Sequence, residues 1–354
     1  MSVRREFGEG INSVMFCEAY GKGDPQQLDL DILVNKILLN VESRAGFVVG
    51  TAGVVMLFNV MFLSAYDGDC QDYYIKRALR GPPPQDDPAL LKWVRGQLVP
   101  PSRLPYNLSF FMSGLHQEVD LNISSYSPSQ EFILGKLEQI FGDRIEQPGT
   151  FLEAGAYDGE FLSNTLYLEH EYNWRGVLIE ANPIFFQQLI LKHRRSWALN
   201  LCLNTKPYPS QESFVMGSGS PVRVNHLYSS DGEEPADPLL ERHISLGSSS
   251  LLQFKDNNTQ AGKETEVQCV PLYTVVRSLG LSHLDFLSLD VERAEMGILN
   301  TIPWDKLSFK VLAIEHLTSE DLIEYMAERG IQHVASKLAD HIFINKNMAV
   351  VKTI

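Results

Sequence analysis

The feature that most constrains this 354-residue sequence is an uncharged stretch at positions 45–66, AGFVVGTAGVVMLFNVMFLSAY. About 20 apolar residues in a helix cross the hydrocarbon core of a membrane, so the stretch predicts one transmembrane helix. It starts too far from the N-terminus, and its apolar run is too long, for a cleavable signal peptide. A buried core helix is the alternative, although Gly46, Gly50 and Gly53 would make a soluble helix weak.

Two glycines in this stretch, Gly46 and Gly50, form a GxxxG pattern. Small residues at this spacing let two membrane helices approach closely, which would give a homodimer. Small residues placed by composition alone are the other interpretation. The partners that the stretch itself predicts are the membrane and a second copy of the chain.

The orientation of the helix follows from glycosylation sequons, because the Lys and Arg counts on its two sides are nearly equal. Three N-x-[ST] sequons, at Asn107, Asn122 and Asn257, all lie after the stretch. A glycosylated sequon faces the lumen. Chance alone would supply about two such sequons in a chain of this length, so it is together with the resemblance described below that they favour a cytosolic segment at 1–44 and a lumenal or extracellular C-terminal part.

Charge and cysteine content exclude several classes of protein. The chain carries 30 Lys and Arg against 44 Asp and Glu, a net charge of −14, and has no basic run. A nucleic-acid partner is therefore not expected. The four cysteines show no CxxC spacing, which argues against a zinc ribbon or a thioredoxin-like site. An oxidising lumen would allow Cys202 and Cys269 to form a disulfide; two unrelated buried thiols are the alternative.

Beyond the membrane helix, the chain divides into two regions. Residues 67–126 contain GPPPQDDP and VPPSRLP, which predict a proline-rich stem with a short helical patch between them. Residues 127–354 alternate helices with short apolar strands, the pattern of a doubly wound α/β sheet. We expect a long insertion at 205–265, either a cargo-binding face or a flexible connection, and a C-terminal antiparallel hairpin. Strands are expected at 150–155, 176–182, 198–204, 284–291 and 309–316, and helices at 128–141, 162–171, 184–193, 274–280 and 320–329.

Acidic and glycine residues follow the expected strands, where an open parallel sheet binds its ligand. The first strand ends in EAGAYDG, residues 153–159, whose glycines allow a tight turn. The second ends in Glu180, placed to accept hydrogen bonds from a ribose diol. Asp290 and Glu292 follow a later strand. A glycine turn without a phosphate-binding GxGxxG, paired with an acid at the second strand, favours a cationic, phosphate-free nucleoside ligand such as S-adenosylmethionine.

The segments FLEAGAYDGEFLSNTLYLE, WRGVLIEANP, LDFLSLDVERAEMGIL and VLAIEH together resemble the FkbM-type methyltransferase family. With a membrane helix and proline-rich stem, the arrangement resembles its arthropod Star-like branch. The resemblance implies a class I methyltransferase-like (Rossmann-like) fold. It also implies an S-adenosylmethionine site made by Glu153, Gly155, Asp158, Gly159 and Glu180. If Glu153 and Asp158 only cap loops, the pocket would be empty.

The resemblance leaves two functions open. One is a non-catalytic lumenal module acting in endoplasmic reticulum to Golgi transport of membrane-tethered growth-factor precursors, with the endosome and plasma membrane as further locations. The other is an O-methyltransferase with Asp290, Glu292 and His316 as candidate bases. The structural alternatives are that Asp290 caps the following helix, that Glu292 pairs with Arg293, and that His316 is a core histidine. Arg293 stands where the family usually has glycine, which puts catalysis and cofactor binding in question more than the fold, and no metal site is indicated.

Overall fold

The computed structural model describes residues 80–108, 128–217, 248–255 and 261–346. The predicted membrane helix at 45–66, the segment 1–44 and the sequons at Asn122 and Asn257 lie outside these ranges. Within them, no helix is both long enough and apolar enough to cross a membrane. The chain divides into two compact units at residue 82, and the fold below is that of the second, Pro83–Ile354.

The main sheet has seven strands in the order β10-β11-β9-β8-β1-β2-β3. Strand β1 (Thr150–Ala154), the middle one of the five parallel strands, pairs with β2 (Arg175–Ile179) and with β8 (His283–Leu289). The outer parallel strands are β3 (Trp197–Leu199) beside β2 and β9 (Ser308–Glu315) beside β8. Strand order therefore reverses at β1, and the predicted parallel sheet is confirmed.

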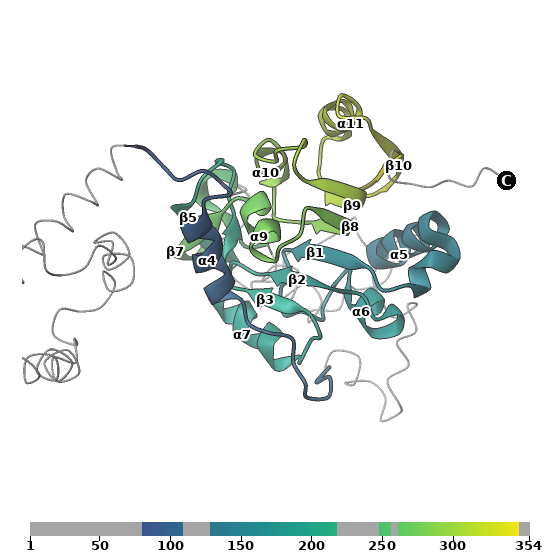
Figure 1. Cartoon of the computed structure of the whole chain (residues 1–354), viewed down its shortest axis with the longest axis horizontal. Helices are drawn as coiled ribbons and strands as arrows, with labels where there is room; N and C mark the ends of the chain where they lie inside the picture. Colours follow the sequence, from purple (N-terminus) through teal and green to yellow (C-terminus); the bar gives the residue numbers. More distant parts are fainter. Residues whose placement is uncertain (1–79, 109–127, 218–247, 256–260, 347–354) are drawn as a thin grey trace, which may run out of the picture. The chain divides into compact units, whose positions relative to one another are not determined.

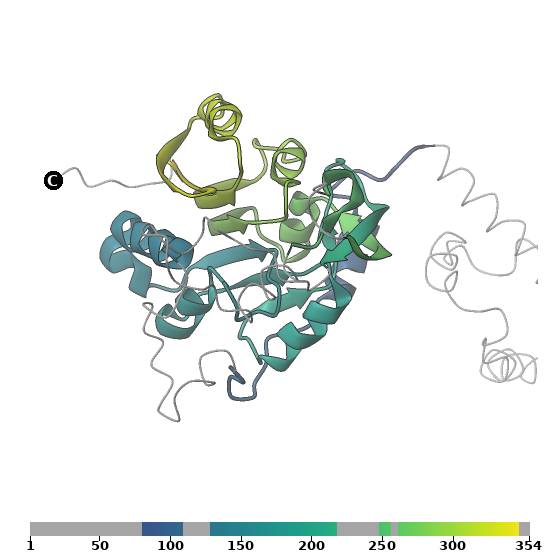
Figure 2. The same ribbon diagram turned by 180° about the vertical axis from the view of Figure 1, so that it is seen from behind.

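Helices cover both faces of this sheet because its buried strands are apolar on both sides. Leu152 and Ala154 of β1 belong to one core cluster, and Phe151 belongs to the other. Figure 1 shows the sheet between α4 and α9 on the left and α5 and α6 on the right, and Figure 2 shows it from behind. Four helices contribute to the first core cluster: α4 (Pro88–Gln97), α9 (Leu272–Ser278), α10 (Glu295–Leu299) and α11 (Ser319–Ala327). Three helices contribute to the second: α5 (Pro128–Phe141), α6 (Leu166–Tyr172) and α7 (Pro183–Leu191). The 3-10 turn η2 (Gly142–Glu146) follows α5.

The predicted C-terminal hairpin is confirmed. It consists of β10 (Ile331–Lys337) and β11 (Asp340–Asn345), which pair antiparallel. β11 also pairs antiparallel with β9, so the hairpin extends the main sheet. In this register Asp340 lies opposite Glu315 at the carboxyl end of β9.

Part of the region predicted as a long insertion forms a second sheet, so the alternative of a flexible connection is wrong for its described strands. The strand order of this sheet is β4-β7-β5-β6. Its strands are β4 (Cys202–Leu203), β5 (Ser210–Gly217), β6 (Ser250–Leu251) and β7 (Ala261–Val270). The 3-10 turn η3 (Leu252–Phe254) follows β6. In β7, Val267 and Cys269 are buried and alternate with polar residues, which suits a sheet with one covered face, and in β5 Phe214 and Val215 are buried. The single strand predicted at 198–204 is instead divided between β3 and β4, which belong to different sheets.

Part of the predicted stem packs on the domain. Asp87 caps α4, and Leu90 and Val94 on one side of this helix are buried in the core. The Arg95 side chain donates a hydrogen bond to the carbonyl of Ser278 at 2.8 Å. Because an amphipathic helix must cover its apolar side, these residues of the predicted stem belong to the same compact unit as the domain, Pro83–Ile354.

Candidate functional site

A cavity of about 240 Å³ lies at the carboxyl ends of four parallel strands. Gly155 follows β1, Glu180 follows β2, Asp290 follows β8 and Glu315 ends β9, and all four line the cavity. Open α/β sheets bind ligands outside these strand ends, where the strand order reverses. The cavity therefore occupies the place in the fold where a ligand is expected.

Gly155 allows β1 and β8 to meet closely at this edge. Its φ is +84°, in the left-handed region that favours glycine. A Cβ added there would lie 1.8 Å from the carbonyl oxygen of Asp290. Any larger residue would push Asp290 and the end of β8 away from the cavity.

Glu180 is held in place by backbone groups. Its two carboxyl oxygens accept hydrogen bonds from the N–H of Tyr157 at 2.8 Å and of Asn182 at 2.7 Å. Burial raises the pKa of Glu180 to about 7. Each carboxylate oxygen has a second lone pair, so both can still accept a bond from a ligand hydroxyl.

One side of the cavity is apolar. It includes Ile179, Phe185 and Leu251, and the rings of Tyr157 and Phe185 pack with their centroids 4.1 Å apart and their planes tilted by 35°. Flat apolar surfaces of this kind accept an aromatic ring. The apolar side together with Glu180 fits the base and the ribose of a nucleoside.

The opposite side carries four carboxyl side chains, which we call the acidic wall: Asp290, Glu292, Glu315 and Asp340. Asp290 as a whole residue is accessible to solvent, but its carboxyl group is buried. This burial raises the pKa of Asp290 well above the ordinary value, and the nearby carboxyl of Glu315, to which it is hydrogen-bonded, raises it further. Burial raises the pKa of Glu292 to about 8 and that of Asp340 to about 6. At neutral pH Glu292 therefore largely retains its proton, whereas Asp340 is largely ionised.

Strained backbone surrounds this cavity. Among the described residues, seven other than glycine have positive φ, and four of them line the cavity: Tyr157, Leu162, Glu292 and Leu338. Arg293, next to Glu292, has a φ of +78°. Such conformations cost free energy and concentrate at functional sites, where the surrounding fold enforces them.

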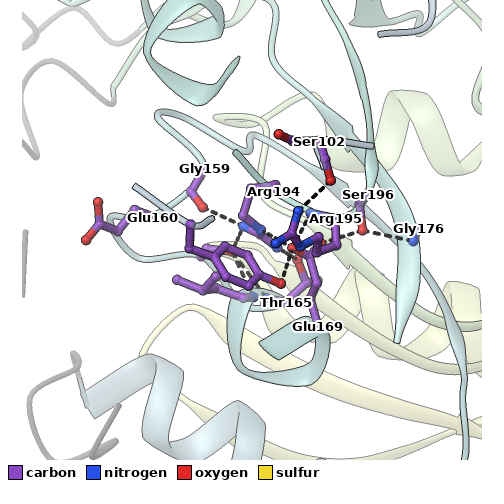
Figure 3. Close-up of polar contacts among 12 residues, drawn as sticks. Ser102, Gly159, Glu160, Thr165, Glu169, Gly176, Arg194, Arg195 and Ser196 are labelled. Carbon is purple, nitrogen blue, oxygen red and sulfur yellow. Dashed lines mark hydrogen bonds and ion pairs between the residues drawn. The ribbon is translucent and has the colours of Figure 1, made fainter. Parts of the chain in front are cut away.

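The other acids predicted at the strand ends, Glu153 and Asp158, belong to a second group of charges, which we call the salt-bridge cluster. Figure 3 shows the part of this cluster around Arg194 and Glu169. At its centre is Arg194, of which 3% is exposed. Its Nε lies 3.0 Å from Glu169 Oε1, and its Nη1 donates to the carbonyl of Gly159 at 2.5 Å. The cluster comprises Arg194, Lys192, Glu153, Asp158, Glu160 and Glu169.

Within the salt-bridge cluster, Glu153 caps the turn before α6. It accepts hydrogen bonds from the backbone N–H of Asn164 at 2.7 Å and from the hydroxyls of Ser163 and Thr165 at 2.9 and 2.5 Å. The helix predicted at 162–171 begins only at Leu166 because this turn occupies the preceding residues. Burial raises the pKa of Glu153, and the charge of Arg194 opposes that rise.

Asp158 and Gly159 also serve the loop rather than the cavity lining. Asp158 accepts hydrogen bonds from the N–H groups of Glu160 and Phe161 at 2.9 and 2.7 Å, and lies 3.4 Å from Lys192 Nζ. His316, likewise outside the lining, lies 3.7 Å from Glu295 and 3.0 Å from the Thr318 hydroxyl. Of the residues predicted for the site, the structure brings Gly155, Glu180, Asp290 and Glu292 to the cavity.

Sequence reasoning missed two members of the acidic wall. Glu315 ends a predicted strand, so its position was a usable signal. Asp340 falls in the predicted C-terminal hairpin, and the pairing that sets it opposite Glu315 cannot be read from the sequence. In the described part of the chain, no group of three or more His, Cys, Asp or Glu side chains is arranged to hold a metal ion.

The sheet, its two helix layers and the cavity define a Rossmann-like domain of the methyltransferase type. A model of the FkbM methyltransferase domain matches residues 153–340, just over half of the chain, and the chain belongs to this family. Comparison with curated proteins yields no match.

Two solved structures are similar to this chain. One is methyltransferase FkbM from Methylobacillus flagellatus, at 14% identity and a TM-score of 0.31, covering 56% of this chain and 43% of its own length. The other is a putative RNA methyltransferase from Pyrococcus horikoshii, at 10% identity and a TM-score of 0.30, covering 64% of this chain and 84% of its own. This chain thus spans less than half of the first of these proteins.

Proposed function

We propose that this chain is a single-pass membrane protein of the secretory pathway, of the Star-like branch, with its FkbM domain in the lumen. The observation that supports a lumenal domain is the disulfide between Cys202 and Cys269, whose Cα atoms are 4.4 Å apart on the paired strands β4 and β7. Structural disulfides persist in oxidising compartments and are rare in the cytosol. Asn107 is exposed, as a glycosylated sequon requires.

In this proposal, residues 1–44 face the cytosol, 45–66 cross the membrane, and the domain assists transport of membrane-tethered growth-factor precursors from the endoplasmic reticulum to the Golgi. The resemblance to the Star-like branch supports the cargo assignment. Deleting the gene in cultured cells that express such a precursor should leave the precursor in the endoplasmic reticulum. Normal delivery to the Golgi in the deleted cells would contradict the transport role.

The topology has its own test. The wild-type chain should shift in mobility after glycosidase treatment, and a variant with Asn107→Gln, Asn122→Gln and Asn257→Gln should not. Mass spectrometry without reduction should find the peptides of Cys202 and Cys269 linked. An unglycosylated chain with free thiols would place the domain in the cytosol instead.

A second candidate function is favoured by the cavity, namely S-adenosylmethionine-dependent O-methyl transfer. The residues present fit this cofactor. Glu180 can accept bonds from a ribose, Ile179 and Phe185 can cover an adenine ring, and the acidic wall complements a positive charge. When bound, the cofactor supplies a methyl group on a positively charged sulfur.

For this reaction the chain provides Asp290 and Glu292 beside the ligand position. Either carboxylate can accept the proton of a hydroxyl group once it is ionised, and their raised pKa values bring that ionisation toward neutral or alkaline pH. Incubating the full chain with tritiated cofactor and secretory membranes should label an acceptor. Label that is stable to base indicates an ether, label lost in base indicates an ester, and absence of label contradicts methyl transfer on these acceptors.

A further inference from the structure

The charges around the cavity are unbalanced. The acidic wall contributes four carboxyl groups, and Glu180 contributes a fifth. Among the described residues of the lining there is no Lys, Arg or His. The exposed side chain of Arg293 lies outside the lining, although its charge lowers the pKa of Glu292 somewhat. The cavity therefore attracts positive charge that its described lining does not supply.

Glu292 provides a second and independent observation. Its side chain lines the cavity, and no described residue gives it a hydrogen bond or an ion pair. The whole residue is partly accessible, yet its carboxyl group is buried enough to raise its pKa to about 8. The charged groups that face it are Glu315, Glu295, Arg293 and Asp290. An enclosed carboxyl without a partner is costly to ionise unless a ligand brings the opposite charge.

The cavity lining indicates which kind of cation fits. The carboxyl groups come from three different strand ends, and the described residues form no metal-binding group. Two exposed apolar side chains, Leu162 at 37% and Leu338 at 52% exposure, also line the cavity. Spread negative charge beside apolar side chains suits an ammonium group carried on a carbon chain rather than a bare metal ion.

We propose that the acidic wall binds the alkylammonium group of a second ligand, next to the position of the nucleoside cofactor. The proposal deepens the second candidate function, because it names the acceptor as an amine-bearing molecule, and it rests on the same cavity. An anionic acceptor is excluded by the same charges. Because the acidic wall loses protons as pH rises, binding should be stronger at about pH 8.5 than at about pH 6.

The test is a calorimetric titration of the full chain in detergent with n-hexylammonium, 1-hexanol, hexanoate and Mg²⁺, each with and without S-adenosylmethionine. Hexylammonium should bind about tenfold more tightly than hexanol, and hexanoate should not bind. Glu292→Gln should weaken hexylammonium binding by about tenfold, with a similar loss for Glu315→Gln. Glu146→Gln, which changes an exposed acid outside the cavity, should leave binding unchanged.

The outcomes separate this proposal from the cofactor site. Cofactor binding without hexylammonium binding overturns the amine proposal alone. Hexylammonium binding without cofactor binding supports the cation site and removes methyl transfer. Equal affinity for hexylammonium and hexanol, loss of hexylammonium binding to competing Mg²⁺, or an unchanged affinity in Glu292→Gln also overturns the proposal.

Discussion

The salt-bridge cluster and the acidic wall are both groups of enclosed acids, and they differ in whether the protein supplies the counter-charge. In the first, Arg194 and Lys192 reach buried carboxylates at 3.0 and 2.5 Å. In the second, no basic side chain of the described lining does so. Burial pushes the pKa of Glu169 upward, but Arg194 and hydrogen bonds from Ser196 and Arg195 outweigh it and leave the pKa below its ordinary value. The pKa of Glu292 rises instead.

This difference indicates that the salt-bridge cluster has a structural role and that the acidic wall has a functional one. A matched set of buried charges fixes the loop between β1 and α6, and removing one partner leaves the others uncompensated. An unmatched set of buried charges lowers the stability of the protein when no ligand is bound. A fold retains such a set where the charges serve binding or catalysis. The comparison predicts opposite effects for charge removal in the two groups.

The largest effect should come from removing the cation of the salt-bridge cluster. Arg194→Met leaves Glu153 and Glu169 buried without their counter-charge, and should lower the free energy of unfolding by about 3–5 kcal/mol. Urea unfolding followed by circular dichroism measures it. Arg103→Met, at an exposed position, is the matched control and should change stability little. A small loss in Arg194→Met would mean that the two groups do not differ as described.

A smaller effect of opposite sign is expected in the acidic wall. The unfolded chain loses the Glu292 proton near pH 4.5 and the folded chain near pH 8, so ionisation of this group lowers stability progressively between these values. Glu292→Gln removes that cost. Because solvent screens the charge of this partly accessible residue, we expect less than the full linkage value, a stabilisation of roughly 2 kcal/mol at high pH, with little effect at acid pH.

Unfolding at a series of pH values checks this prediction, with Glu146→Gln as the control. Stabilisation that does not depend on pH would point to packing rather than to charge. Destabilisation at high pH would show that Glu292 has a cationic partner after all.

The smallest effect concerns the backbone beside the acidic wall. Arg293 has a φ of +78°, where glycine is favoured. Arg293→Gly should therefore stabilise the protein by about 1 kcal/mol, whereas Arg103→Gly, at a position without positive φ, should not. A loss of stability in Arg293→Gly would show that contacts of the arginine side chain outweigh the strain.

Much of the cavity could be predicted from the sequence, because residues that follow parallel strands meet at one edge of the sheet. Gly155, Glu180 and Asp290 were found in this way. Glu153 stands at the same motif but points to the opposite side, because neighbouring side chains in β1 alternate between faces and it shares the face of Phe151. Its partner Arg194 is distant in sequence and gave no local signal.

The second sheet was missed for a related reason. β5 and β7 are rich in polar residues, and only their pairing across a long connection buries Phe214 and Val267. The sequence of either strand alone resembles a loop. Long-range pairing also explains why the position of Asp340 could not be predicted, since it depends on the register between β11 and β9.

The most direct test of the account is a calorimetric titration of the full chain with S-adenosylmethionine. The wild type and Glu146→Gln should bind with equal affinity, and Glu180→Gln, which weakens the ribose contact, should bind at least about tenfold less tightly. Absence of binding by the wild type, or the same affinity in all three proteins, would contradict the assignment of the cavity as the nucleoside site.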